Sequence, residues 1–274
     1  MRVNNYDKCI NDVINAIEKN LEFVTIEELI ALSGYSYYHF HRIFKIHTGE
    51  SLKKYIKRLQ LERALQKMKI DKENITQLAL EAGFYMSSSF NKAFKEMFEL
   101  SPTEYKKQLA QKRERFLEIT PVRFESLKPF EVFALRYVGE CELIDTSFEK
   151  MLGFANGNNL FEESFELYGI TYDDPDVTED TKLRYDICIK KTTEIDISES
   201  SEIYLKTIDG GKYAVFHHNT GTPTLVDTYN SIFGKWLYQN DIRLRNVPIV
   251  QKIYYDPTLE SIDDYLIDIY IPIE

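Results

Sequence analysis

Internal repetition is the feature of this sequence that most restricts its fold. Residues 34–45, GYSYYHFHRIFK, and residues 83–95, GFYMSSSFNKAFK, share one frame of glycine, aromatic and basic positions. In both stretches the apolar residues fall at i, i+3 and i+4, which is the spacing of one helix face. We expect this face to be buried through Phe40, Ile43 and Phe44 in the first copy and through Phe90, Ala93 and Phe94 in the second.

Each copy predicts two short helices joined by a tight turn, the arrangement of a helix-turn-helix unit. Thr25 and Glu28 have the spacing of a capping box, and Gly34 can end the first helix at a positive φ. Ser36 can then cap the second helix. The predicted helices cover residues 25–33 and 37–47 in the first copy and residues 74–80 and 87–98 in the second. Residues 7–20 and the longer amphipathic segment 52–68 predict two more helices.

Polar residues occupy the positions that remain exposed once the apolar face is buried. Arginine, lysine, asparagine and hydroxyl side chains are the types that contact bases and phosphates of DNA. Solvation alone would explain any one of them, but the same constellation occurs twice. The candidate DNA-binding residues are Tyr37, Tyr38, His41, Arg42 and Lys45 in the first copy and Ser87, Ser88, Asn91, Lys92 and Lys95 in the second.

The two halves of the chain carry opposite charge. Residues 1–115 contain 20 Lys and Arg against 15 Asp and Glu, a net charge of +5. Residues 116–274 contain 14 against 29, a net charge of −15. A basic first half joined to an acidic second half favours a polyanionic partner for the first half only.

Residues 5–110 resemble the DNA-binding domain of the AraC family of transcription regulators. The resemblance is carried by TIEELIALSGYSYYHFHRIFKIHTGESLKKYIKRLQLERA and by ITQLALEAGFYMSSSFNKAFKEMFELSPTEYKK. It implies seven helices, with two helix-turn-helix units bridged by a long central helix. It also implies that both recognition helices enter successive major grooves of double-stranded DNA, ~34 Å apart. If the protein activates transcription, RNA polymerase is a further expected partner.

Two positions depart from the pattern of that family. Glu99 stands where a glycine usually follows Phe98, so the turn must form without glycine. Leu52 replaces a frequent proline at the start of the central helix. Neither position is among the candidate DNA-binding residues, and the resemblance therefore stands.

A second repeat, with an offset of 82 residues, occupies the remainder of the chain. The offset relates Asp145 to Asp227 and Asp186 to Asp268. It also relates the Tyr-x-Asp-Pro stretch at 172–175 to the one at 254–257. Each half predicts a strand, a helix and two strands, and the helices IDTSFEKMLGFA and VDTYNSIFGKWL each open with an Asp-Thr pair suited to capping. Two such halves would form an antiparallel sheet with a concave site at their seam.

The stretch from about Val122 to the end resembles the effector-binding domain known as GyrI-like. The carriers are VRFESLKPFEVFALRYVGE, YGITYDDPDVT, IDGGKYAVFHHNTGT and DIYIPIE. The resemblance implies an aromatic cleft for small, often cationic compounds, with an inward-facing glutamate whose position here is Gln251. A neutral amide offers only hydrogen bonds to a ligand, so a preference for cations is not expected. The candidate ligand-binding residues are Tyr137, Tyr168, Tyr229, Trp236 and Gln251.

The expected fold is an all-α N-terminal domain of seven helices with two helix-turn-helix units, followed by an α+β domain made of a duplicated βαββ unit. We place the DNA-binding domain at residues 1–112, a linker at 113–121 and the effector-binding domain at 122–274. The expected function is a cytoplasmic, sequence-specific transcription regulator that senses a small molecule. Neither a metal, a cofactor nor a membrane is expected as a partner.

Two alternatives to the regulator remain. The second half could sequester a compound or a protein, as gyrase-inhibitor proteins do, while the first half localises it. An enzyme is the other alternative, since some GyrI-like relatives hydrolyse their ligands. That chemistry needs an acid-base group in the cleft, where this chain has Gln251. His217 and His218 are not accompanied by a nucleophile in any catalytic motif, so we expect no enzyme.

Overall fold

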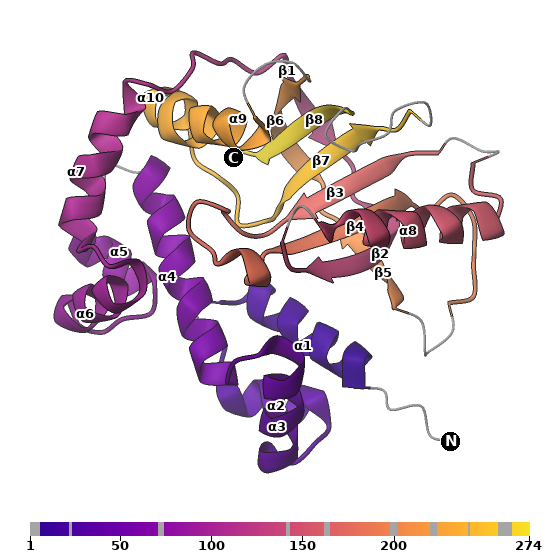
Figure 1. Cartoon of the computed structure of the whole chain (residues 1–274), viewed down its shortest axis with the longest axis horizontal. Coiled ribbons are helices and arrows are strands. Elements are labelled where there is room, and N and C mark those ends of the chain that lie inside the picture. The colour runs from indigo at the N-terminus through magenta and orange to yellow at the C-terminus, as the bar shows by residue number, and fades with distance from the viewer. Residues whose placement is uncertain are drawn as a thin grey trace. The chain divides into compact units, whose positions relative to one another are not determined.

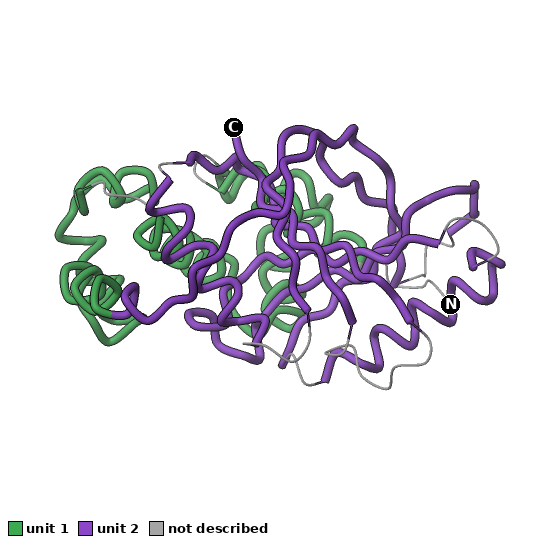
Figure 2. The backbone as a smooth tube through the Cα atoms, turned by 90° about the horizontal axis from the view of Figure 1, so that it is seen from above, with its two compact units in different colours: residues 1–111 green, residues 112–274 purple. Residues whose placement is uncertain are grey.

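The structure is a computed structural model that describes residues 6–21, 24–70, 74–140, 143–161, 165–197, 202–219, 224–240, 242–256 and 265–274. The chain forms two compact units, Met1–Gln111 (unit 1) and Lys112–Glu274 (unit 2), coloured separately in Figure 2. The separate linker at 113–121 stays a prediction. None of the described helices is both long and apolar enough to cross a bilayer.

Unit 1 is helical, as predicted. Within the described residues its helices are α1 (Tyr6–Lys19), α2 (Ile26–Ser33), α3 (Tyr37–Thr48), α4 (Leu52–Ile70), α5 (Ile75–Glu81), α6 (Ser87–Phe98) and α7 (Pro102–Arg113), whose last two residues already belong to unit 2. Helix α4 packs against α3 and against α5, so it joins the two helix pairs α2–α3 and α5–α6 (Figure 1). Nineteen residues at 1.5 Å per residue give α4 a length of about 28 Å.

The turns of both helix pairs follow from local chemistry. The Thr25 hydroxyl accepts from the Glu28 amide and the Glu28 carboxylate accepts from the Thr25 amide, so the capping box is present. Gly34 ends α2 with φ +69°. Ser36 occupies the cap position of α3, but its side chain makes no capping hydrogen bond. Glu99 ends α6 with φ +61°, in the left-handed conformation that Gly49 adopts after α3.

The apolar face of each recognition helix is buried. Phe40, Phe44, Phe90 and Phe94 are fully buried and Ala93 is 3% exposed, whereas Ile43 is half-buried against the same core. Burying a side chain of this size stabilises the fold by about 1.5–3 kcal/mol. Burial of this face fixes which side of α3 and α6 remains in water.

Unit 2 contains an eight-stranded antiparallel sheet. Its strands are β1 (Arg123–Leu127), β2 (Phe130–Val138), β3 (Leu167–Thr171), β4 (Arg184–Lys190), β5 (Ile203–Ile208), β6 (Gly211–His218), β7 (Ile249–Tyr254) and β8 (Leu266–Pro272). The helical segments are α8 (Asp145–Gly157), a 3₁₀ turn (Asp180–Lys182), α9 (Leu225–Ser231), a π-helical stretch (Ile232–Leu237) and α10 (Tyr238–Asn240). The duplicated α+β fold is confirmed.

Two local expectations in unit 2 need correction. Each half begins with a short edge strand, β1 or β5, ahead of the predicted βαββ unit. These strands were not predicted, because five or six residues give little periodic signal. Neither Asp-Thr pair occupies the cap position of its helix, although Asp227 takes part in capping α9. Ile144 occupies the cap position of α8 without a side-chain bond, and Thr224 caps α9 in a capping box with Asp227.

The strand order expresses the duplication. The order is β1-β6-β8-β7-β3-β4-β2-β5, and exchanging β1–β4 with β5–β8 gives the same order reversed. The two halves meet where β3 pairs with β7. The offset of 82 residues therefore corresponds to a pseudo-twofold axis at this seam.

Two short connections require the sheet to curl. Lys128 and Pro129 alone join β1, the first strand in the order, to β2, the seventh. In a flat sheet these strands would be about 29 Å apart, whereas a two-residue connection spans only about 11 Å. The turn at Gly210, between β5 and β6, lies against this connection: a Cβ built on Gly210 would be 2.7 Å from Cδ of Pro129. One face of the sheet is thus an inner face.

The two faces of the sheet have different cores. On the outer face, α8 packs on the sheet through Phe148 and Met151, against Phe133 and Leu135 of β2. The inner core is formed by side chains of the strands themselves. Its buried members are Val132, Ala134, Tyr168, Ile170, Cys188, Ile208, Tyr213, Val215, Val250 and Tyr270.

Two carboxylates related by the offset of 82 are buried in this sheet. Asp186 accepts from the Tyr172 hydroxyl and pairs with Arg136 and Lys206. Asp268 accepts from the Tyr254 hydroxyl at 2.9 Å and pairs with Arg123 at 2.8 Å. Burial alone would raise the pKa of both carboxyl groups. The positively charged and hydrogen-bonding partners have the larger, opposite effect, so the pKa of each carboxyl group is lowered.

Candidate functional sites

Helix α3 presents a polar and aromatic surface to solvent. Tyr37 is 50% exposed and Tyr38 86% exposed. The Tyr37 ring stacks on the His41 imidazole with centroids 4.1 Å apart, and Nδ1 of His41 lies 3.1 Å from the Tyr37 carbonyl oxygen. Arg42 and Lys45 are exposed on the same helix. All five predicted residues of the first copy therefore lie on one helix outside the core. The Tyr37 and His41 rings hold each other in place by stacking.

Helix α6 carries the second set with smaller side chains. Ser88, Asn91, Lys92 and Lys95 are exposed and Ser87 is half-buried. Lys92 Nζ lies 3.9 Å from Glu96 on the next turn, and both side chains are more than half exposed. Such a pair contributes little to stability, so Lys92 remains available to a phosphate or a base. The ten predicted residues therefore lie on two helices, one in each of the helix pairs that α4 joins.

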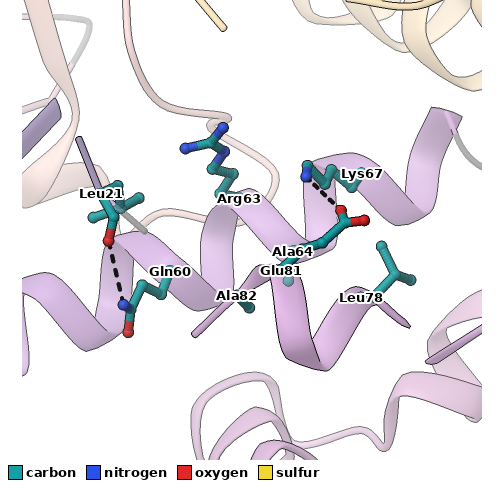
Figure 3. A pocket seen from close by; sticks show the side chains of 8 residues that line it. All are labelled: Leu21, Gln60, Arg63, Ala64, Lys67, Leu78, Glu81 and Ala82. Atoms are coloured by element: carbon teal, nitrogen blue, oxygen red, sulfur yellow. Dashed lines mark hydrogen bonds and ion pairs between the residues drawn. The ribbon is translucent and has the colours of Figure 1, made fainter. Parts of the chain in front are cut away.

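A small cavity lies where α4 meets α5 (Figure 3). It is lined by Leu21, Gln60, Arg63, Ala64, Lys67, Leu78, Glu81 and Ala82. Gln60 Nε2 donates to the Leu21 carbonyl at 3.4 Å and Lys67 Nζ lies 2.6 Å from Glu81. Its volume of about 10 Å³ holds no more than one water molecule, so it is too small for an effector. The Lys67–Glu81 pair joins α5 to α4, and the Gln60 bond joins Leu21, which follows α1, to α4.

Gln251 is the centre of a buried hydrogen-bonded chain on the outer face of unit 2. Its Oε1 accepts from the Tyr185 hydroxyl at 2.6 Å and its Nε2 donates to the Tyr229 oxygen at 2.8 Å. Gln251 is 3% exposed, and burial raises the pKa of Tyr229. The chain joins β4, β7 and α9, so it crosses the seam between the two halves.

Gly169 makes this chain possible. It faces Gln251 across the β3–β7 pair and corresponds to Gln251 by the offset of 82. A Cβ on Gly169 would lie 1.6 Å from the Tyr185 hydroxyl oxygen, so only glycine leaves room for that phenol. Tyr185 was not predicted as a site residue. The alternation of Tyr185 with Ile187 and Ile189 along β4 indicates that Tyr185 lies on the buried face of the strand. Its contact with Gln251, however, depends on the register of the paired strands.

The other predicted ligand-binding residues lie elsewhere. Trp236 is 6% exposed and packs edge-on against Phe216 with centroids 4.8 Å apart. Tyr137 donates to the Glu140 carbonyl at 2.6 Å. Tyr168 lies in the inner core. Gln251 and Tyr229 are therefore in direct contact, whereas the contacts described for Tyr137, Tyr168 and Trp236 are with other residues.

Within unit 2, the first residues of the unit, 113–116, contact the π-helical stretch. Nε of Arg113 donates to the Gly234 carbonyl at 2.9 Å, and the Lys235 ammonium donates to the Phe116 carbonyl at 2.9 Å. A Cβ on Gly234 would lie 2.2 Å from the Phe116 ring. These contacts involve residues of the predicted linker, whose docking could not be inferred from composition. Among the described residues, no group of three His, Cys, Asp or Glu side chains is placed to hold a metal ion.

Comparison with known proteins gives matches to both units. The model of the GyrI-like small molecule binding domain matches residues 120–274, and that of a helix-turn-helix domain matches residues 29–108. The chain is 36% identical over 109 residues to the multiple antibiotic resistance protein MarA of Escherichia coli, covering 39% of this chain and 86% of MarA.

Two further matches cover different shares of the chain. It is 28% identical over 159 residues to the SPbeta prophage-derived putative transcriptional regulator YosT of Bacillus subtilis, covering 56% of this chain and 99% of YosT. An AraC-type transcriptional regulator from Chromobacterium violaceum has a solved structure that matches with a TM-score of 0.36 and 27% identity. That match covers 38% of this chain and 94% of the other.

Proposed function

Because the chain belongs to the family of GyrI-like small molecule binding domains and carries an AraC-type helix-turn-helix domain, it is a DNA-binding transcription regulator, and we propose how its two units divide that work. Unit 1 reads one duplex site through α3 and α6. Unit 2 binds a small effector on the outer face around Gln251.

The doubled recognition surface carries the proposal for unit 1. Residues that hydrogen-bond bases and phosphates lie exposed on α3 and again on α6. The length of α4, about 28 Å, is close to the ~34 Å that separates successive major grooves on one side of DNA. One chain then reads two base blocks about one helical turn apart, and a dimer is not required.

A selection from random duplex DNA with the full-length protein at near-physiological salt tests this assignment. We expect enrichment of a site with two short conserved blocks about one helical turn apart. Variants of α3 and of α6 should each erase one block and keep the other. Enrichment of a single block, or salt-sensitive binding without any enriched sequence, would contradict the doubled reading.

Gln251→Glu tests the outer-face site in unit 2. The carboxylate would be buried beside the Tyr185 and Tyr229 hydroxyls, and a buried carboxylate favours a cationic partner. We therefore expect N-methylquinolinium, a planar aromatic cation, to bind the variant at least tenfold more tightly than the native protein in a fluorescence titration. Gln251→Leu is the matched control, since it removes the amide without adding charge. Equal binding by all three proteins would place the cation elsewhere.

The finer parts of the function follow from this division. We propose regulation rather than catalysis, because the Gln251 amide has no acid-base capacity. We place the protein in the cytoplasm, where DNA is the partner of unit 1. RNA polymerase is the further partner if the protein activates, and transcription from a template with the selected site, with and without the protein, measures the sign of regulation.

A further inference from the structure

A second cavity lies on the inner face of the curled sheet, opposite the outer-face chain around Gln251. Its volume is about 320 Å³, within the range of small-molecule sites. It lies at the seam, where Tyr168 of β3 pairs in register with Lys252 of β7. The Lys128–Pro129 connection between β1 and β2 forms part of its wall. The cavity therefore exists because the short connections make the sheet curl.

One carboxylate in this cavity forms ion pairs with two ammonium groups. Glu166 Oε2 lies 2.5 Å from Lys190 Nζ, and Glu166 Oε1 lies 2.5 Å from Lys252 Nζ. The three side chains are 21%, 39% and 24% exposed respectively, so they are only partly hydrated. Glu125, the other acidic residue of the lining, lies 2.9 Å from Arg123, which also pairs with Asp268. With Lys128, the lining carries three lysines against two glutamates, so it keeps an excess of one positive charge.

Aromatic rings lie beside the two ammonium groups. The Phe130 and Tyr168 rings are in contact, with centroids 5.2 Å apart. Lys190 Nζ is 5.6 Å from the centre of the Phe130 ring, and Lys252 Nζ is 5.8 Å from the centre of the Tyr168 ring. A ligand with a planar apolar body and one negative charge would meet both a ring surface and the unbalanced ammonium charge.

The duplication shows that the fold itself does not require these charges. By the offset of 82, the counterparts of Glu166, Lys190 and Lys252 are Pro248, Pro272 and Ile170. A charge cluster needed to hold the strands together would be needed in both halves. This cluster is present in one half only.

We propose that the inner cavity binds a small aromatic carboxylate, whose oxygens bind the Lys190 and Lys252 ammonium groups while its ring packs on Phe130 and Tyr168. The proposal rests on small-molecule binding by unit 2 and specifies a further site and its charge. It differs from the outer-face site both in location and in the sign of the ligand charge.

Calorimetric titration of the full-length protein with 2-naphthoate tests the site, with N-methylquinolinium as the cation of matched size. We expect one naphthoate per chain and weaker binding of the cation. Lys190→Gln and Lys252→Gln should each weaken naphthoate about tenfold, because each removes a charge-assisted hydrogen bond. Glu166→Gln should tighten it severalfold, because it releases both ammonium groups. A purely structural role for Glu166 would give the opposite sign.

Lys150→Gln is the matched control, since it removes the same charge outside the cavity. Lys150 lies on α8 and forms an exposed ion pair with Glu202 at 2.9 Å. It should leave naphthoate affinity unchanged, and the fluorescence of Trp236 reports whether each variant is folded. The proposal is overturned if native protein shows no saturable naphthoate binding, or if Lys190→Gln binds like the native protein. Naphthoate binding that survives Lys190→Gln but is lost in Gln251→Leu would leave small-molecule binding standing and move it to the outer face.

Discussion

Replacing Arg42 with alanine is expected to weaken binding to the selected DNA site by about 1–3 kcal/mol and to relax preference at one base pair. Arg42 is exposed on α3, one residue after the ordered Tyr37–His41 pair. A guanidinium that bonds O6 and N7 of one guanine discriminates that base pair from the other three. Titrating the variant against the selected site and against every single substitution of it, at fixed salt, measures both effects.

Two comparisons separate base reading from simple charge. Lys19→Ala, in the last turn of α1, removes the same charge from unit 1 outside α3 and α6, and should change affinity little and specificity not at all. If Arg42→Ala weakens all sequences equally and lowers the slope of log affinity against log salt by about one, Arg42 contacts a phosphate. An unchanged affinity would remove Arg42 from the interface.

Replacing Arg136 with alanine should destabilise unit 2 by about 3–5 kcal/mol. Arg136 pairs with Asp186, and the two side chains are 8% and 0% exposed. Removing one partner of a buried pair leaves the other charge less well compensated, since Asp186 then keeps only Lys206 and the Tyr172 hydroxyl. Urea unfolding followed by Trp236 fluorescence reports on unit 2, since this is the only tryptophan of the chain.

The same variant should also change the response to acid. The pKa of Asp186 is lowered in the folded protein, so its contribution to stability is present above the unfolded pKa of ~3.9 and is lost as the pH falls through the folded pKa. Without Arg136 the folded pKa rises, and unit 2 should unfold at a higher pH than in the native protein. Lys150→Ala, which breaks an exposed pair, should cost no more than about 1 kcal/mol. A comparable loss in both variants would mean that the Asp186 pair is not a stabilising feature.

Local patterns explain how much of the fold was predictable. The recognition helices followed from apolar residues at i, i+3 and i+4, and α6 spans the predicted residues 87–98. Glycine and capping residues located the ends of α2, because these signals act within a few residues. The short edge strands β1 and β5 were missed, because they are recognised only through their pairing with distant strands.

The candidate sites divide in the same way. Exposure of Arg42 and Asn91 followed from burying the opposite helix face, which is a property of one helix. Tyr185 reaches Gln251 only because β3, β4 and β7 pair in one register and Gly169 lies between them. Tyr168 and Tyr229 were grouped by residue type, yet they belong to opposite faces of the sheet.

The sequence by itself determined the doubled recognition helix, the duplicated second unit and the opposite charges of the two halves, since periodicity, offset and composition are local or additive properties. Only the tertiary structure decided that the sheet curls, and that Glu166, Lys190 and Lys252 converge at its seam. Glu166 and Lys252 are 86 positions apart in the sequence. Strand order and register bring them together, and both depend on contacts between segments that are distant along the chain.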